Sequence, residues 1–168
     1  MSLSEHWIEA EETHPIDMAE AIAEAMEWEF ERIDGDQLAL AVEGDWRTYA
    51  VTLAWCPGDE TLRLALTYEM EELGEGRSDV VNALLNSVND RVWTGAFTHW
   101  AEQGLMVWRY GLALDGAEGA TAQQIDRMVR SAATAADRFY PAIQLAAYGE
   151  TDADAALQVA IAETYGRA

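Results

Sequence analysis

Side chains that commonly bind metals or act as nucleophiles are few in this chain and lie far apart. The histidines His6, His14 and His99 lack the spacing to one another, to cysteine or to acids that metal ligands show. Cys56 is the only cysteine, so it has no internal disulfide partner and suits a reducing compartment. It ends an apolar strand pattern and precedes Pro57, which favours a small buried residue over a nucleophile. We therefore expect no metal site, and a partly buried, structural His99.

Motifs for phosphate binding and acyl transfer are absent from the sequence as well. All ten basic residues are Arg, so the lysine-dependent P-loop mechanism is not open to this chain. Neither a dinucleotide-binding glycine pattern nor a G-x-S-x-G elbow occurs. Carboxylate pairs such as Glu71 and Glu72 are expected by chance among 31 acidic residues. The sequence predicts no catalytic residue, no cofactor and no enzymatic activity.

The charge of the chain excludes further classes of partner. Its formal charge is −21, which repels phosphate backbones and anionic lipid headgroups, so we expect no nucleic-acid and no membrane partner. No window approaches the ~18 consecutive apolar residues of a membrane helix. Met1 to Thr13 carry four Glu, no basic residue and no apolar region of the secretory type. A cytoplasmic location is the expectation.

Length and composition indicate one folded unit. The chain has 168 residues, half of them hydrophobic, with seven Trp and six Tyr, which is enough to bury a core. No repeat, low-complexity tract or long linker separates domains. We divide the chain into an acidic N-terminal extension, residues 1–15, and a single domain, residues 16–168, that includes a C-terminal helix over 152–165.

Apolar residues spaced by three and four predict a first amphipathic helix from Asp17. Asp17 and Glu20 resemble a capping pair at its start. Glutamates continue at the same spacing along another face: Glu20, Glu24, Glu27 and Glu31. We interpret this acidic run as a solvated helix face rather than a site for a basic partner.

Alternation of large and small residues predicts antiparallel strands next. A short strand over Phe30–Ile33 ends at the turn Asp34–Asp36. Longer strands follow over residues 38–42, 49–55 and 62–70. The four-residue loop Pro57–Glu60 sets the register of the last two, with all large residues on one face. The predicted pairs are Trp55 with Leu62, Leu53 with Leu64, Val51 with Leu66, and Tyr49 with Tyr68.

The second half of the chain mixes helix and hairpin signals. The expected elements are a helix capped by Ser78, strands over Gly95–Trp100 and Leu105–Leu114, a long helix opened by a Thr121–Gln124 capping box and bent or ended by Pro141, and a last helix capped by Thr151 and Asp154.

These elements predict an α+β fold. We expect an antiparallel sheet of five to six strands with helices packed on the face that carries the large residues. The order is helix, three strands (four with the short first one), helix, two strands and two helices. Four large residues should be buried together in the core: Trp55, Leu64, Leu66 and Trp108.

The opposite face of the predicted sheet carries small residues and two arginines. Its members are Ala39, Ala41, Ala50, Thr52, Ala54, Arg63, Ala65, Val107, Arg109, Gly111 and Ala113. Two explanations stay open. Either a helix or the termini cover this face, or it contacts a second copy or a client protein, because small residues permit close approach and Arg gives directional bonding. The candidate interaction residues are Arg63, Ala65, Arg109 and Gly111.

Two asparagines near the end of the second predicted helix share one of its faces, because Asn86 and Asn89 are three residues apart. We interpret them as hydrogen-bond partners of the adjoining strand's backbone, which set up the turn into Gly95, rather than as ligand groups. Gly95 itself suits a close backbone approach at the start of a strand.

Four short motifs occur in order along most of the chain: Leu84–Asn89, Gly95–Phe97, Val107–Tyr110 and Phe139–Pro141. Together they resemble the YbjN family, a group described as "putative bacterial sensory transduction regulators", over residues 16–148. The family residues matched are Asn86, Asn89, Gly95, Phe97, Arg109 and Pro141. The acidic N-terminal extension and the helix after Gly149 lie outside this pattern.

The resemblance implies a fold similar to the type III secretion chaperones, which are small, acidic and commonly homodimeric. It implies a non-enzymatic cytoplasmic regulator or chaperone-like module that binds a protein partner or client of unknown identity and forms a homodimer. The alternative is a small-ligand sensor, in which the Trp- and Tyr-lined side of the sheet keeps a cavity. An enzyme is the third and weakest hypothesis.

Overall fold

Helices flank and interrupt two groups of strands in the described part of the chain, residues 13–114 and 119–166. The computed structural model contains α1 (Pro15–Ala25), β1 (Glu29–Asp34), β2 (Gln37–Glu43), β3 (Thr48–Cys56), β4 (Thr61–Glu69), α2 (Arg77–Asn89), β5 (Ala96–Trp100), β6 (Leu105–Ala113), α3 (Ala122–Tyr148) and α4 (Ala153–Gly166). This order confirms the predicted α+β class. The short Phe30–Ile33 segment forms β1, so four strands stand between α1 and α2.

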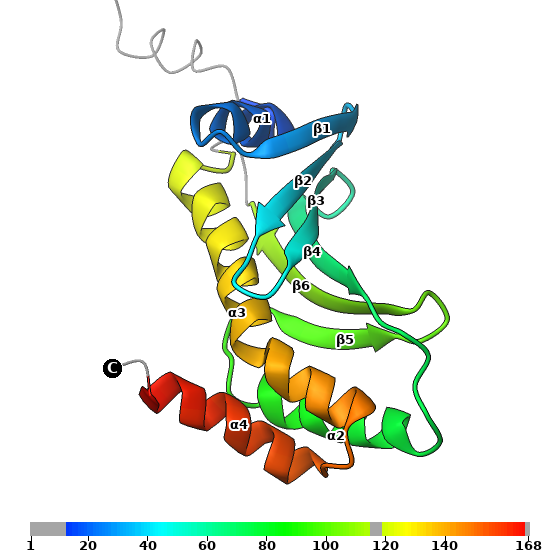
Figure 1. Ribbon diagram of the computed structural model, residues 1–168. Coiled ribbons are helices and arrows are strands. Elements are labelled where there is room, and N and C mark those ends of the chain that lie inside the picture. Colours follow the sequence, from blue (N-terminus) through cyan, green and yellow to red (C-terminus); the bar gives the residue numbers. More distant parts are fainter. Residues whose placement is uncertain (1–12, 115–118, 167–168) are drawn as a thin grey trace, which may run out of the picture.

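The strands form one antiparallel sheet in the order β1-β2-β3-β4-β6-β5 (Figure 1). The β3–β4 hairpin has the predicted register, with Leu53 opposite Leu64 and Val51 opposite Leu66. β6 lies antiparallel beside β4 and places Trp108 opposite Leu66. A period-two register of this kind collects most of the large apolar side chains of these strands on one face.

The large-residue face of the sheet forms the core together with α1 and α3 (Figure 1). Trp108 and Tyr49 are the largest of its fully buried side chains. The α3 helix begins at the predicted Thr121–Gln124 capping box, with both reciprocal hydrogen bonds present. It continues through Pro141, and its yellow and orange halves point in different directions in Figure 1. Pro141 therefore lies within the helix rather than at its end.

The start of α1 differs from the prediction. His14 caps the helix, because its Nδ1 accepts a hydrogen bond from the amide of Ile16 at 3.1 Å, and Pro15 occupies the first turn. Asp17 and Glu20 do not cap the helix. Both accept hydrogen bonds from the Arg32 guanidinium of β1, at 2.9 and 2.7 Å. The predicted Asp17 cap was therefore wrong, and the two acids tie α1 to the first strand.

The predicted four-glutamate helix face was also wrong. Only Glu20 and Glu24 lie in α1, which ends at Ala25. Glu27 has a positive φ of 56° in the turn, and Glu31 lies in β1. The amide of Trp28 closes this turn by bonding the Ala23 carbonyl at 2.9 Å. The prediction was wrong because it continued the helical spacing of the glutamates past Ala25, where the helix ends and the chain turns.

Two further helix caps differ from the prediction. Gly76, with a φ of 77°, precedes α2, and no side chain caps this helix, so Ser78 lies inside it. At α4, Asp152 Oδ1 accepts a hydrogen bond from the amide of Ala155 at 2.8 Å, so neither Thr151 nor Asp154 is the cap. The left-handed conformation of Gly76 lets the loop enter the helix without a side-chain cap.

Three of the four residues expected together in the core are fully buried: Leu64, Leu66 and Trp108. Trp55 is only partly buried. It lies at the end of β3, and its ring meets that of His14 edge-on at 6.5 Å. The expectation was wrong for Trp55, because α1 begins beside this end of the sheet and does not cover it completely.

A glycine, an asparagine and a tryptophan fix the start of β5. Gly95 has a φ of 75°, and a Cβ at this position would lie 2.0 Å from Cζ2 of Trp108. Asn89 at the end of α2 accepts a hydrogen bond from the Phe97 amide at 2.8 Å and donates one to the Phe97 carbonyl at 2.9 Å. These contacts hold α2, β5 and β6 against one another.

Trp108→Ala should lower the free energy of unfolding by about 3–5 kcal/mol, because it leaves a large cavity under α3. Trp93→Ala serves as the control, since Trp93 is fully exposed and its loss should change stability by less than about 0.5 kcal/mol. Urea titrations of both variants measure the difference. A cost below about 1 kcal/mol for Trp108→Ala would contradict the packing described above.

Asn89→Ala should lower the free energy of unfolding by about 2 kcal/mol, because it removes two hydrogen bonds and leaves both Phe97 backbone groups unpaired. Asn86→Ala is the matched control: Asn86 is exposed on the same helix, and its substitution should be neutral within about 0.5 kcal/mol. Equal losses in the two variants would show that the Asn89 bonds contribute nothing.

Candidate interaction surface

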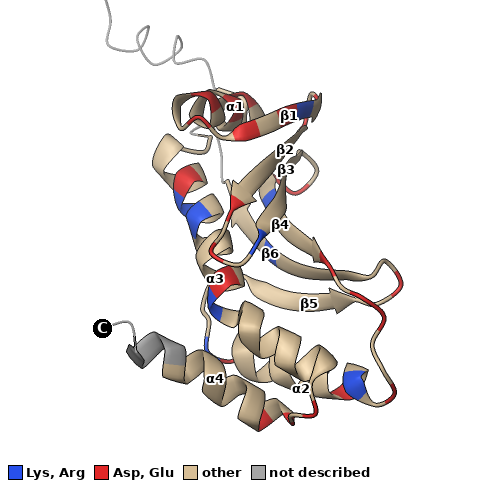
Figure 2. Ribbon diagram, viewed as in Figure 1, with Lys and Arg blue, Asp and Glu red and all other residues tan. Residues whose placement is uncertain are grey.

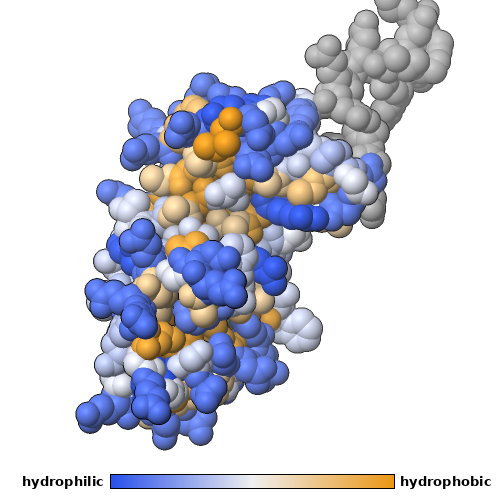
Figure 3. Space-filling model, turned by 90° about the vertical axis from the view of Figure 1, so that its right-hand side faces the viewer, coloured by the Kyte–Doolittle hydropathy of each residue, from blue (hydrophilic) through white to orange (hydrophobic). Residues whose placement is uncertain are grey.

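The face of the sheet opposite the core is called the open face below. It carries Ala39, Ala41, Ala50, Thr52, Ala54, Arg63, Ala65, Thr67, Ala96, Thr98, Trp100, Val107, Arg109, Gly111 and Ala113. No described helix packs on it, since the buried residues of α1, α2 and α3 all belong to the core on the other side. Figure 3 views the molecule from the side away from α3 and shows apolar residues exposed between hydrophilic ones. In the described part of the chain, a covering helix is therefore not the explanation for these small residues.

The four candidate interaction residues lie together on the open face. Arg63 is paired with Gly111, and Ala65 with Arg109, across β4 and β6. All four line one shallow, open hollow of about 750 Å³. The structure therefore brings together the four residues that the sequence alternation placed on one face of the sheet. The hollow forms between the two arginines because Ala65 and Gly111 have small side chains.

The two arginines of this hollow differ in their electrostatic surroundings. Arg63 donates to Asp59 Oδ2 at 2.6 Å across the β3–β4 turn, and this hydrogen bond holds the pKa of the Asp59 carboxyl below its ordinary value. Arg109 is exposed and forms no ion pair with any residue that the structure describes. Arg109 is therefore the cation on this face that remains available to an acidic partner.

Two tryptophans that the sequence interpretation left out flank the hollow. Trp93, in the turn before β5, is fully exposed, and Trp100, at the end of β5, is 37% exposed. Both line the same hollow as Arg109. Aromatic and arginine side chains are enriched at protein contacts. The signal that could have found Trp93 is a large aromatic between the end of a helix and a turn glycine.

The residues singled out for metal or nucleophile chemistry lie apart. His14 caps α1 and contacts Asp36, and His99 lies in β5, where burial lowers its pKa. Cys56 is partly exposed rather than buried, because it ends β3 at the margin of the sheet. His6 lies outside the described residues. Among residues 13–114 and 119–166, no three potential ligands gather as a metal site would require. None of the helices in this part of the chain has the length and apolar character to cross a membrane.

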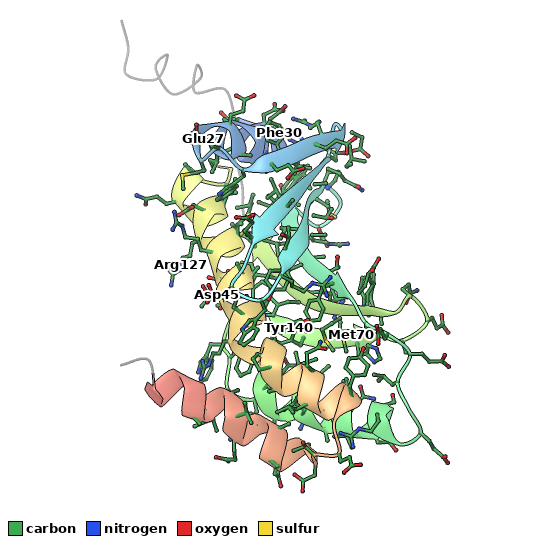
Figure 4. The ribbon with its side chains drawn as sticks, in the orientation of Figure 1. Glu27, Phe30, Asp45, Met70, Arg127 and Tyr140 are labelled. Atoms are coloured by element: carbon green, nitrogen blue, oxygen red, sulfur yellow. The ribbon has the colours of Figure 1, made fainter. Side chains whose placement is uncertain are left out.

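The Trp- and Tyr-lined side of the sheet is occupied by packed side chains. Tyr49 donates a hydrogen bond to Asp137 of α3 at 2.8 Å, and the Tyr68 ring lies 5.4 Å from that of Tyr140. In Figure 4, Tyr140 and Met70 lie close together where α3 crosses the sheet. The Tyr68 hydroxyl and the Trp108 indole nitrogen are buried without a hydrogen-bond partner among the described residues. This side therefore serves as the core, and burial raises the pKa of Tyr68 well above its ordinary value.

Four of the six matched motif residues have structural positions. Asn89 bonds the Phe97 backbone, Gly95 packs against the Trp108 ring, and Pro141 lies inside α3. Asn86 is exposed on α2. Arg109 is the motif residue that belongs to the open face.

Comparisons with known proteins agree with this architecture. A family model described as "YbjN: Putative bacterial sensory transduction regulator" matches residues 15–145. Among solved structures, the fold is similar to "Crystal structure of YbjN, a putative transcription regulator from E. coli", with a TM-score of 0.52 and 15% sequence identity over 73% of this chain and 85% of that one. No curated protein matches the chain. Since the family model spans most of the sequence and the fold agrees with it, the chain belongs to the YbjN family.

Proposed function

We propose that this protein is a non-enzymatic, cytoplasmic regulator or chaperone-like interaction module that forms a homodimer through its open face. The observation that carries the proposal is a sheet face of mostly small residues that no described helix covers, exposed or half-exposed apart from Val107, with Arg109 free of ion pairs among the described residues. Small side chains let a partner approach closely, and a guanidinium bonds carboxylates with directional geometry.

The charge distribution favours the open face over the α1 end for self-association. Figure 2 shows acidic residues gathered on α1 and β1. Two copies meeting there would bring Glu24, Glu27 and Glu29 of each against one another, and salt only partly screens such repulsion. The open face carries Glu43 and Glu69 at strand ends besides Arg63 and Arg109, so charges of opposite sign can pair across a contact there. Closed twofold symmetry is the common arrangement for a self-complementary patch of this kind.

A regulatory role through protein contacts also agrees with the charge. The solved relative is called a transcription regulator in its title, and the family is described as sensory. A net charge of −21 disfavours direct contact with DNA. The module would therefore act by binding a protein, as the acidic secretion chaperones implied by the family resemblance do.

The small-ligand sensor is the second candidate and has less support. It requires a cavity on the Trp- and Tyr-lined side of the sheet, which is filled here by α1 and α3. An interaction module requires a filled core and an exposed contact strip, and the described chain has both. The packing therefore favours the interaction module.

Size exclusion with light scattering should report a mass of about twice 18.6 kDa. Arg109→Glu should weaken the dimer by about tenfold or more, because it replaces the guanidinium that would bond a carboxylate of the other copy with a second carboxylate. Arg91→Glu changes the net charge equally outside the open face and should leave the dimer intact. A monomer at high concentration and ordinary salt would refute the dimer. A dimer that is unchanged by Arg109→Glu would refute the assignment to this face.

A further inference from the structure

The strand β6 extends beyond its neighbour β5 and has an unpaired edge. The pairing begins at Ala96 opposite Arg109, so Tyr110–Ala113 meet no described strand on that side. In Figure 1, β6 continues past the point where β5 begins. The positive φ of Gly95 turns the preceding chain away from β6 at this point. The edge of β6 is unpaired because β5 starts late, at Ala96; β6 itself continues as a strand to Ala113.

The backbone groups at this edge can be assigned from the hydrogen bonds of β6 on its other side. The Leu114 amide donates to the Glu60 carbonyl, and the Gly104 carbonyl accepts from the Met70 amide, so even-numbered residues direct their backbone groups toward β4. Because the pattern alternates in an antiparallel ladder, Gly111 and Ala113 direct theirs outward. Both residues are exposed. They offer the hydrogen-bonding pattern that a further strand would need.

A hollow lies on each side of this edge. The hollow of the open face is on one side, and a second hollow of about 320 Å³ separates the edge from α3 on the other. Thr94 and Tyr110 line both. Side chains of an added strand would point alternately to the two sides and so enter both hollows.

An arginine is available in each hollow. Arg109 lies in the hollow of the open face, and Arg127 of α3 lines the second one. Figure 4 shows Arg127 extending outward from α3. Neither guanidinium has an ion pair within the described residues. The opposite edge of the sheet, β1, carries Glu29, Glu31 and Asp34 instead.

We propose that the unpaired edge of β6 binds an extended acidic segment of a partner protein by strand addition. This inference rests on the proposed function, because it names the class of partner that the module would bind. The segment would bond the backbone of Gly111 and Ala113 and direct carboxylates alternately to Arg109 and Arg127. A small anion is a poorer fit, since the two guanidiniums lie on opposite sides of the edge. The β-strand rise of ~3.3 Å per residue makes about four or five residues sufficient.

The test is fluorescence anisotropy with the fluorescein-labelled heptapeptide Val-Glu-Glu-Val-Glu-Glu-Val, whose adjacent glutamates point to both sides of an added strand, compared with the same peptide carrying Gln for Glu. The Glu peptide should bind about tenfold more tightly than the Gln peptide, and added salt should reduce the difference. Arg127→Glu should weaken binding of the Glu peptide by about tenfold. Arg91→Glu, with the same change in net charge, should leave it within about twofold.

Ala113→Pro tests the backbone contact, because it removes an outward amide without touching the β4–β6 ladder. It should weaken binding of both peptides by about fivefold or more, whereas Ala113→Ser keeps the amide and should bind like the wild type. Circular dichroism and urea titration establish that each variant is folded; if Ala113→Pro does not fold, Arg127→Glu decides. Equal binding of the two peptides, or wild-type binding by a folded Ala113→Pro, would overturn the proposal.

Light scattering on the same samples separates this proposal from the dimer. The open-face dimer and the edge site share Arg109 and one hollow, so peptide binding is measured at dilutions where light scattering reports the monomer. Arg127→Glu should keep the dimer mass at high concentration while losing the peptide at low concentration. A protein that is monomeric at every concentration and binds the Glu peptide would refute the dimer and support the edge site. A protein that dimerises when concentrated but binds neither peptide when dilute would refute the edge site alone. Assemblies larger than a dimer that Ala113→Pro dissolves would identify a second copy as the occupant and overturn the acidic partner.

Discussion

The contact between the Trp108 ring and the Gly95 backbone is the constraint on which the rest of the structure depends. No side chain fits at Gly95, because the indole occupies that space. The chain must therefore turn there in a left-handed conformation, and β5 begins only at Ala96. This starting point sets the length of the edge that β6 leaves unpaired. The same indole closes the core beneath α3, so the stability of the fold and the shape of the exposed edge have a common origin.

One-sided packing follows from the residues that alternate with Trp108. The sheet places most of its large apolar side chains toward α1 and α3, and the open face carries mainly small residues together with Arg63, Arg109 and Trp100. The helices of the described chain all pack on one side of the sheet, so no described helix shields the other side from solvent. Ala65 and Gly111 cannot cover the backbone beneath them, and the result is a hollow between arginines rather than a flat surface.

Much of the fold could be predicted because its signals are local or strictly periodic. The alternation around Leu53 and Leu64 determined the hairpin register, and Thr121 with Gln124 determined the start of α3. The caps were harder to predict. His14 caps α1 with a ring nitrogen, and Asp17 is drawn away by Arg32, a partner 15 residues further on. The open face was predictable from alternation, but the unpaired edge was not, since it depends on the relative lengths of two strands and on Arg127 of a distant helix.

The acidic residues of α1 and β1 and the arginines beside the β6 edge lie at opposite edges of the sheet. The surface charge of the molecule is therefore asymmetric. The net charge of −21 repels an approaching acidic chain, most strongly at the end that carries Glu29 and Glu31 and least at the end that carries Arg109 and Arg127. Such a field acts before contact and selects the orientation of the encounter, so it governs the association rate more than the lifetime of the complex. Association of an acidic segment would accordingly be slowest in dilute salt and would speed up as added ions screen the net repulsion.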